Sequence, residues 1–287
     1  EWIYTRTGIK QRHIADKSQL TSDLAILAAK DAFKMGSIKP NEIDCIIVAT
    51  TTPDETFPST ATKVQNHFKI GNIPAFDVQA VCSGFLYSLQ VADSFIKSNN
   101  ANKILVIGAE TLSKIVDWED RRTCVLFGDG AGAVVLSSSE KNKGILSTKL
   151  YSDGSWHDSL FSDGGPSLNQ KVGKIRMNGQ DIFKQAVNKL SEATNEALRS
   201  SNLCVGDVDW LIPHQANQRI ISSTAKKLGF HETKTVSTVK FHANTSAASI
   251  PLALSSSLKS GKVKENDLIA LCAIGGGLTW GSSIIRI

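Results

Sequence analysis

Residues 73–90 read IPAFDVQAVCSGFLYSLQ, a stretch that passes from an apolar run through a turn of small residues into a second apolar pattern. The first six residues predict a short buried strand, and the apolar residues after the turn recur with a helical period. Cys82 therefore lies at the first turn of a predicted helix, where unpaired backbone N–H groups and the helix dipole favour negative charge. This position predicts a lowered thiol pKa and a reactive cysteine. The competing interpretation is an ordinary core cysteine, because free cysteines are often buried.

The composition is that of a soluble globular protein. The chain has 287 residues, of which 41% are hydrophobic and 21% charged, with a net charge of +5. No apolar run approaches the ~18 residues of a membrane span, and no charged-then-apolar leader suggests secretion. Without a lysine and arginine block, and with 7% aromatic residues, nucleic-acid binding has little support.

The cysteines and histidines argue against a disulfide framework and against a metal site. Five cysteines are scattered without a C-x-x-C pair, and the six histidines include no H-E-x-x-H motif. We therefore expect no metal, and a reducing compartment: the cytoplasm of a bacterium, or a plastid in a eukaryote.

Strand patterns alternate with helical patterns along the whole chain. This alternation predicts α/β layers with buried, largely parallel strands. Strands are predicted over residues 45–50, 73–78, 103–109, 130–136, 208–213, 235–239, 268–273 and 282–287, and helices over 59–68, 217–228 and 246–259. The GDGAGA run at 128–133 is not a dinucleotide fingerprint, because a strand and not a helix follows its glycines.

The order of elements repeats. Cys82 lies 21 residues before the strand that starts at Lys103, and Asn244 lies 23 residues before Asp267 at the corresponding strand of the second half. Two such units about a pseudo-twofold axis would bring both turns to one cleft at the carboxyl ends of the strands. We expect halves of residues 1–140 and 141–287, with residues 111–128 as an insertion in the first.

Three further features belong at this predicted cleft. His214 directly follows a strand, although a lone histidine there is also a candidate cap for the next helix. The glycines at 275–277 offer backbone N–H groups to a developing oxyanion, or form a flexible turn. Arg219 and Lys226 share the polar face of helix 217–228, with Lys227 at its flank, which suits an acidic partner or a solvated surface.

The motifs resemble those of the β-ketoacyl-acyl-carrier-protein synthase III enzymes of the thiolase-like superfamily. The matching stretches are EWIYTRTGIKQRHIA (1–15), AFDVQAVCSGFLY (75–87), LFGDGAGAVVL (126–136), DWLIPHQANQRIISSTAKKLG (209–229), HANTSAASIPLAL (242–254) and GGGLTWGSS (275–283).

The resemblance implies a duplicated thiolase-like fold with layers α/β/α/β/α and two halves related by a pseudo-twofold axis. It implies a decarboxylative Claisen condensation of an acyl-CoA, namely acetyl-CoA, with malonyl-acyl carrier protein, which initiates fatty acid synthesis. It implies no cofactor, a homodimer, and a strand before the Glu1-Trp2 dipeptide that the first half here lacks.

The resemblance also implies a role for each site residue. Cys82 is the acyl-accepting nucleophile, His214 and Asn244 complete the triad, and the backbone N–H groups of Cys82 and Gly276 form the oxyanion hole. Phe57 would reach the acyl pocket of the neighbouring subunit. The residues that bind coenzyme A would be Trp2, Arg6, Arg121, Phe183, Ala216 and Asn217, and those that meet the carrier protein Gln215, Arg219, Lys226 and Lys227.

Three alternatives remain open at this point. Cysteine, histidine and asparagine also form a papain-like hydrolase triad, although no C-G-S-C-W run is present. A related condensing enzyme of secondary metabolism would have the same triad. An inactive scaffold subunit is the third alternative, and the intact triad argues against it.

Overall fold

Two mixed β-sheets form the framework of the computed structural model, which describes residues 1–139 and 142–287. The first half contributes α1 (Trp2–Thr7), α2 (Thr21–Gly36), β1 (Cys45–Ala49), α3 (Thr60–His67), β2 (Ala75–Val78), α4 (Gly84–Lys97), β3 (Lys103–Thr111) and β4 (Asp129–Ser137). The second contributes β5 (Gly144–Ser152), β6 (Leu160–Ser162), β7 (Ile175–Met177), α5 (Gly179–Ser200), β8 (Trp210–Pro213), α6 (Gln218–Leu228), α7 (Val239–His242), α8 (Ser249–Lys259), β9 (Leu268–Gly275) and β10 (Thr279–Arg286).

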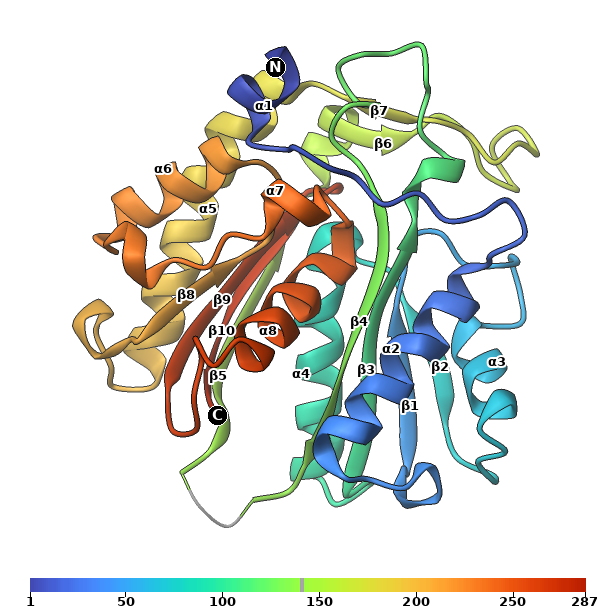
Figure 1. Cartoon of the computed structure of the whole chain (residues 1–287), viewed down its shortest axis with the longest axis vertical. Helices are drawn as coiled ribbons and strands as arrows, with labels where there is room; N and C mark the ends of the chain where they lie inside the picture. Colours follow the sequence, from blue (N-terminus) through green and yellow to red (C-terminus); the bar gives the residue numbers. More distant parts are fainter. Residues whose placement is uncertain (140–141) are drawn as a thin grey trace.

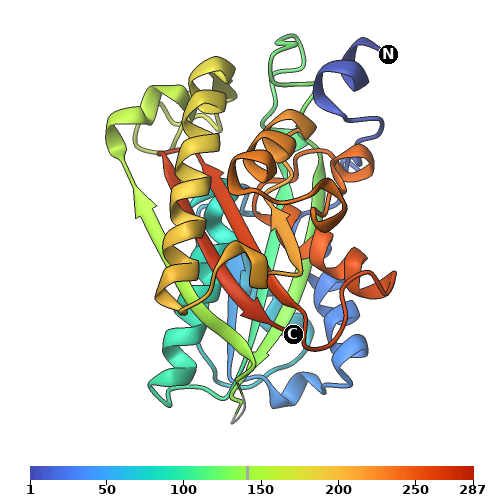
Figure 2. The ribbon, with the colours of Figure 1, turned by 90° about the vertical axis from the view of Figure 1, so that its left-hand side faces the viewer.

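The elements stack in five layers (Figure 1). The sheet β2-β1-β3-β4 has α2 and α3 on its outer face, and the sheet β5-β10-β9-β8 has α5 on its outer face with α6 beside it (Figure 2). Helices α4 and α8 lie between the sheets and contact both. This is the predicted α/β/α/β/α order.

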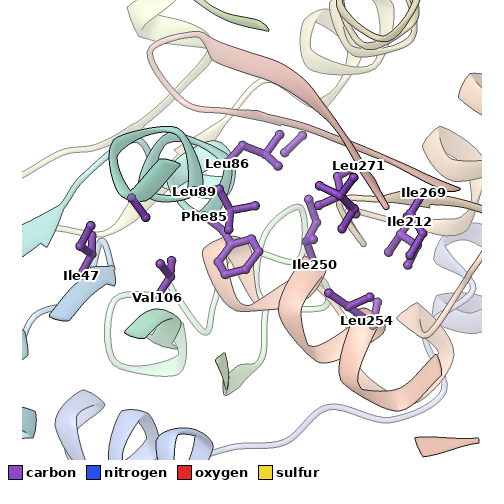
Figure 3. Packing of buried hydrophobic residues seen from close by; sticks show 14 of the residues in the cluster. Ile47, Phe85, Leu86, Leu89, Val106, Ile212, Ile250, Leu254, Ile269 and Leu271 are labelled. Carbon is purple, nitrogen blue, oxygen red and sulfur yellow. The ribbon is translucent and has the colours of Figure 1, made fainter. Parts of the chain in front are cut away.

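The apolar faces of the two central helices hold the halves together (Figure 3). Phe85 and Leu89 of α4 lie between Ile47 of β1 on one side and Ile212 of β8 on the other. Phe85 is 1% exposed, and burying a side chain of this size contributes roughly 1.5–3 kcal/mol. The core is therefore continuous from one sheet to the other.

Strand register shows the internal repeat directly. In the first sheet Val48 of β1 pairs with Ile107 of β3, and in the second Pro213 of β8 pairs with Cys272 of β9, each 165 residues further along. The turn residues Val81 and Ser246 are separated by the same interval, and each has a φ of 49°, a left-handed conformation that costs a non-glycine residue free energy. By this interval the equivalent of Cys82 is Ala247, three residues beyond Asn244.

Each half places the end of one strand against the other half. The end of β3 contacts the short helical turn Ser246–Ala248, here the Ser246 turn, and the end of β9 contacts the turn Val81–Ser83, here the Cys82 turn. Glycine is needed at both contacts. A Cβ atom on Gly108 would lie 2.2 Å from the Ala247 carbonyl oxygen, and one on Gly275 would lie 2.6 Å from the Cys82 nitrogen.

Most predicted elements are present, and the exceptions have local causes. The predicted strand 235–239 is wrong: Thr235 forms one isolated bridge with Leu211, and the chain then turns into α7. Strand β5 was not predicted. The predicted boundary between residues 140 and 141 lies outside the described residues.

Two other expectations for the first half can be compared with the sheets. Residues 112–128 separate β3 from β4, whereas three residues separate β9 from β10, as the predicted insertion requires. In the second sheet β5 pairs with the far side of β10, and among the described residues no strand occupies the equivalent place beside β4.

Candidate active site

Cys82 lies where it was predicted, in the turn between β2 and α4, with 4% of its surface exposed. Its predicted electrostatics are wrong. Burial raises the pKa of the Cys82 thiol to about 12, an effect that the nearby Glu110 carboxyl increases and the Ser246 hydroxyl reduces. A thiol enclosed by protein loses the hydration that stabilises a thiolate, and this loss outweighs the favourable end of α4.

His214 follows β8 directly and is 3% exposed. Its backbone N–H donates to the Cys272 carbonyl at 2.7 Å, and its Nδ1 lies 2.7 Å from the Ser249 hydroxyl. Burial lowers the pKa of His214 to about 3, so the ring is neutral at physiological pH. His214 does not cap the next helix; the Asn217 side chain does, by accepting the N–H of Ile220 at 3.0 Å.

Asn244 lies in the turn after α7 and is 6% exposed. Its backbone bonds to the insertion of the first half: its N–H donates to the Leu126 carbonyl at 3.0 Å, and its carbonyl accepts the N–H of Gly128 at 3.0 Å. Its Oδ1 accepts the N–H of Ser246 at 2.9 Å. This bond fixes the orientation of the amide and leaves its NH₂ end as the donor.

One short segment, residues 244–249, connects the three candidate residues. Asn244 is its first residue, the hydroxyl of Ser246 faces the Cys82 thiol, and Ser249 holds the His214 ring. The Ser246 Oγ also faces the Glu110 carboxyl, yet it is buried without a hydrogen bond of normal geometry to any described residue. The three side chains, from turns far apart in the sequence, therefore share one buried neighbourhood.

Glu110 is a buried carboxyl that the sequence analysis did not single out. It is 0% exposed, and its oxygens accept the Thr51 N–H at 3.0 Å and the Thr52 hydroxyl at 2.7 Å. Burial raises the pKa of Glu110. The sequence analysis did not single out Ser246 or Ser249 either. The available signals were the hydroxyl-rich run TSAAS beside Asn244 and a carboxylate at the end of the apolar run KILVIGAE.

The glycine loop at the end of β9, residues 275–277, lies between the Cys82 turn and the start of β6. Gly275 is in close contact with the Cys82 backbone, and a Cβ atom on Gly276 would lie 2.6 Å from the Leu160 carbonyl oxygen. Gly277 has a φ of 130°, which disfavours any other residue.

The residues expected to bind coenzyme A form two groups. Trp2 of α1 has the guanidinium carbon of Arg6 5.2 Å from its ring centre and that of Arg121 5.0 Å away. Phe183 of α5 and Ala216 pack against the same apolar cluster, beside the cap residue Asn217.

The residues expected to meet a carrier protein divide into exposed and buried ones. Arg219, Lys226 and Lys227 are exposed on α6. Gln215 is 0% exposed, and its Oε1 accepts the backbone N–H groups of Thr238 and Val239 at 2.7 and 3.1 Å. The prediction that Gln215 contacts a carrier protein is therefore wrong, because its amide is used inside the fold.

Phe57, on the loop between β1 and α3, is 83% exposed in the single chain.

No helix among the described residues is long and apolar enough to cross a membrane. In residues 1–139 and 142–287, no three histidine, cysteine, aspartate or glutamate residues group as metal ligands would.

Comparisons with known proteins identify one family. The family model described as 3-oxoacyl-[acyl-carrier-protein (ACP)] synthase III matches residues 76–154, and the model of its C-terminal part matches residues 198–287. A β-ketoacyl-[acyl-carrier-protein] synthase III of Wolbachia pipientis wMel is 59% identical over all of this chain and 90% of that protein. One of Paramagnetospirillum magneticum is 56% identical with the same coverage. The crystal structure of 3-oxoacyl-[acyl-carrier-protein] synthase III from Aquifex aeolicus VF5 matches with a TM-score of 0.95 and 49% identity, over all of this chain and 90% of that one.

Proposed function

The chain belongs to the 3-oxoacyl-[acyl-carrier-protein] synthase III family, and from this premise we propose which residues carry its reaction. It is an acyltransferase that condenses an acyl group from acyl-CoA with malonyl-acyl carrier protein and releases carbon dioxide. The observation that carries our assignment is the segment 244–249, which contacts both Cys82 and His214.

In the first half-reaction the Cys82 sulfur attacks the thioester carbonyl of acetyl-CoA. The new bond joins sulfur to the acyl carbon, the bond to the coenzyme sulfur breaks, and the proton lost by Cys82 is gained by the released coenzyme thiol. The N–H groups of Cys82 and Gly276 hold the oxygen of the tetrahedral intermediate. One such donor contributes roughly 3 kcal/mol in a site without water.

In the second half-reaction malonyl-carrier protein loses carbon dioxide, and the electron pair of the broken bond forms an enolate. The enolate carbon attacks acyl-Cys82, the bond from the acyl carbon to sulfur breaks, and the thiolate that leaves takes a proton from solvent. His214 and Asn244 donate to the enolate oxygen. Donation from Nε2 requires the ring proton there, with Nδ1 accepting the Ser249 hydroxyl at 2.7 Å; the same hydroxyl oxygen also accepts the N–H of Gln215 at 3.2 Å.

Coenzyme A enters along α1 and the start of α6. Its adenine stacks between the Trp2 ring and the Arg121 guanidinium, whose present separation of 5.0 Å must widen to admit it. Arg6, Phe183, Ala216 and Asn217 line the rest of the path, and acidic carrier protein docks on the exposed cations of α6.

The acyl pocket is completed in a homodimer. An aromatic ring as exposed as Phe57 is stabilised when a second copy covers it. Sedimentation across dilution checks this: dilution to monomers should abolish the acyl-chain preference, and a monomer that keeps it would contradict the role of Phe57.

The reaction takes place in the cytoplasm, where the five free cysteines stay reduced.

Two variants separate the two half-reactions. Cys82→Ser should form no covalent acetyl adduct with acetyl-CoA, as measured by the mass of the intact protein. Asn244→Ala should form the adduct but lose decarboxylation of malonyl-carrier protein by about 100-fold, the scale of one lost oxyanion donor. If Asn244→Ala instead abolished the adduct and spared decarboxylation, the assigned roles would be reversed.

The product distinguishes the alternatives. A peptide hydrolase would release peptide fragments and no carbon dioxide. A condensing enzyme of secondary metabolism would prefer another acceptor over malonyl-carrier protein, and mass spectrometry of the product with a mixture of acyl-CoA species would show it.

A further inference from the structure

A pair of hydroxyl groups joins the Cys82 turn to the glycine loop. Thr279, the first residue of β10, has its Oγ1 2.9 Å from the Ala80 carbonyl oxygen and 3.2 Å from that of Gly276. The Oγ of Ser83 lies 2.6 Å from the Thr279 Oγ1 and 2.7 Å from the Ala80 oxygen. The segments so joined are far apart in the sequence, since Ser83 and Thr279 are separated by 196 positions.

The two hydroxyl groups together have two hydrogens, which is enough for two hydrogen bonds between the Cys82 turn and the start of β10. With Thr279 donating to the Ala80 carbonyl, the Ser83 hydroxyl donates to the Thr279 oxygen in place of Ala80; whichever hydroxyl donates, both contacts between the segments involve the Thr279 oxygen. Thr279 takes part in both bonds, whereas Ser83 takes part in one. Removing the Thr279 hydroxyl therefore breaks both connections, and removing that of Ser83 breaks one.

The joined segments are those that present the oxyanion donors of the proposed mechanism. Ala80 precedes the Cys82 turn and Ser83 is its last residue, and Thr279 follows the loop that contains the Gly276 N–H. Gly275 packs against the Cys82 nitrogen and the Val81 side chain, and the Thr279 and Ser83 hydroxyls add the directional bonds that fix the separation of the two segments. An oxyanion hole requires both donors within about 2.7–3.1 Å of one oxygen, and a displacement of 1 Å can cost about 100-fold in rate.

We propose that Thr279 is a positioning residue that holds the N–H groups of Cys82 and Gly276 at the separation needed to bind the oxyanion. The role rests on the proposed function, because it has meaning only if an acyl group is transferred to Cys82.

The test compares two reactions of the same sulfur. Transfer of an acetyl group from acetyl-CoA develops an oxyanion, whereas alkylation by iodoacetamide displaces iodide and develops none. Thr279→Val keeps the shape and removes the hydroxyl, so it should slow acetylation about 10- to 100-fold and leave alkylation of Cys82 within about twofold of wild type. Thr279→Ser should restore most of the acetylation rate.

Ser83→Ala is the matched variant that removes only one connection, and it should slow acetylation by less than Thr279→Val. If Thr279→Val does not fold, as judged by thermal unfolding, Ser83→Ala alone carries the test, with acetylation slowed and alkylation retained.

Three results would overturn the role: unchanged acetylation in Thr279→Val, an equal loss of acetylation and alkylation, or no rescue by serine. Wild-type protein that acetyl-CoA does not acetylate would overturn the proposed function itself. That outcome is distinguishable because it appears before any variant is made.

Discussion

At the scale of single residues, the site combines a protonated thiol with a neutral imidazole, and burial is the main cause of both states. Enclosure disfavours the charged form of each group, so the thiol pKa rises and the imidazole pKa falls. The Glu110 carboxyl adds to the effect on Cys82. Both groups are therefore uncharged at neutral pH, so only a very small fraction of Cys82 is thiolate.

This electrostatic state predicts how alkylation of Cys82 depends on pH. Only the thiolate reacts with iodoacetamide, and a pKa of about 12 lies above the whole accessible range. The rate should thus rise about tenfold per pH unit from pH 7 to pH 10 without a plateau. Mass spectrometry of the Cys82 peptide measures it, in a Cys204→Ser background because Cys204 is exposed. A plateau with a midpoint near pH 8 would contradict the burial argument.

At the scale of elements, α6 presents cations on one face and packs the other against the core. Ile220, Ile221 and Leu228 are buried, while Arg219, Lys226 and Lys227 are exposed. Arg219 lies over the Phe183 ring at 5.3 Å, and Lys227 bonds to Asn188 of α5. Lys226 is therefore the cation with the most freedom to meet an acidic surface.

Charge reversal on α6 tests whether its exposed cations bind the carrier protein, as proposed. Arg219→Glu combined with Lys226→Glu should raise KM for malonyl-carrier protein about tenfold while leaving KM for acetyl-CoA within about twofold, because the lost attraction is confined to the protein substrate. The matched control is Lys30→Glu with Lys34→Glu on α2, two exposed lysines four residues apart. Equal effects of the two pairs would indicate a general charge effect and no docking surface.

The elements also show what the sequence allowed us to predict. The buried strands β1, β3 and β9 are continuous apolar runs, and such runs are visible without a structure. The false strand at 235–239 also has apolar residues, but the Gln215 side chain takes the N–H groups of Thr238 and Val239 that a sheet would need. A contact across more than twenty residues cannot be predicted from local pattern.

Some residues of the candidate site could likewise be predicted from the sequence, and others could not. Cys82 and His214 were found because each follows a strand, where a parallel sheet gathers functional groups. Asn244 was found because the repeat aligned its turn with the Cys82 turn, although the element before it is helix α7 and not the predicted strand. Ser249 and Thr279 were not found, because hydroxyl residues are common and only the fold shows which of them join distant segments. The pKa of Cys82 was predicted in the wrong direction because a sequence shows the start of a helix but not the enclosure around it.

At the scale of the whole molecule, the two halves interlock through their strand ends. β3 of the first half contacts the Ser246 turn of the second, and β9 of the second contacts the Cys82 turn of the first. Glu110 and Gly275, 165 residues apart, are the equivalent strand-end residues. One lies near the Ser246 hydroxyl and the other against the Cys82 backbone.

The contact between β3 and the Ser246 turn predicts an effect on stability. Gly108→Ala would place a Cβ atom 2.2 Å from the Ala247 carbonyl oxygen, so the halves must move apart. We expect a loss of about 2 kcal/mol in the free energy of unfolding, as for other overpacked cores. Gly71→Ala is the control, because it has open space around it and should change stability by less than about 0.5 kcal/mol. Chemical denaturation measures both, and equal stabilities would contradict the interlock.

The exchange of strand ends has a consequence for how such a molecule can change over time. Each half places a strand end beside a turn of the other half, so the two halves cannot vary independently. A substitution in one turn changes its fit against the strand end from the other half, so the two segments must change together during evolution. The two similar halves therefore form a single evolutionary unit.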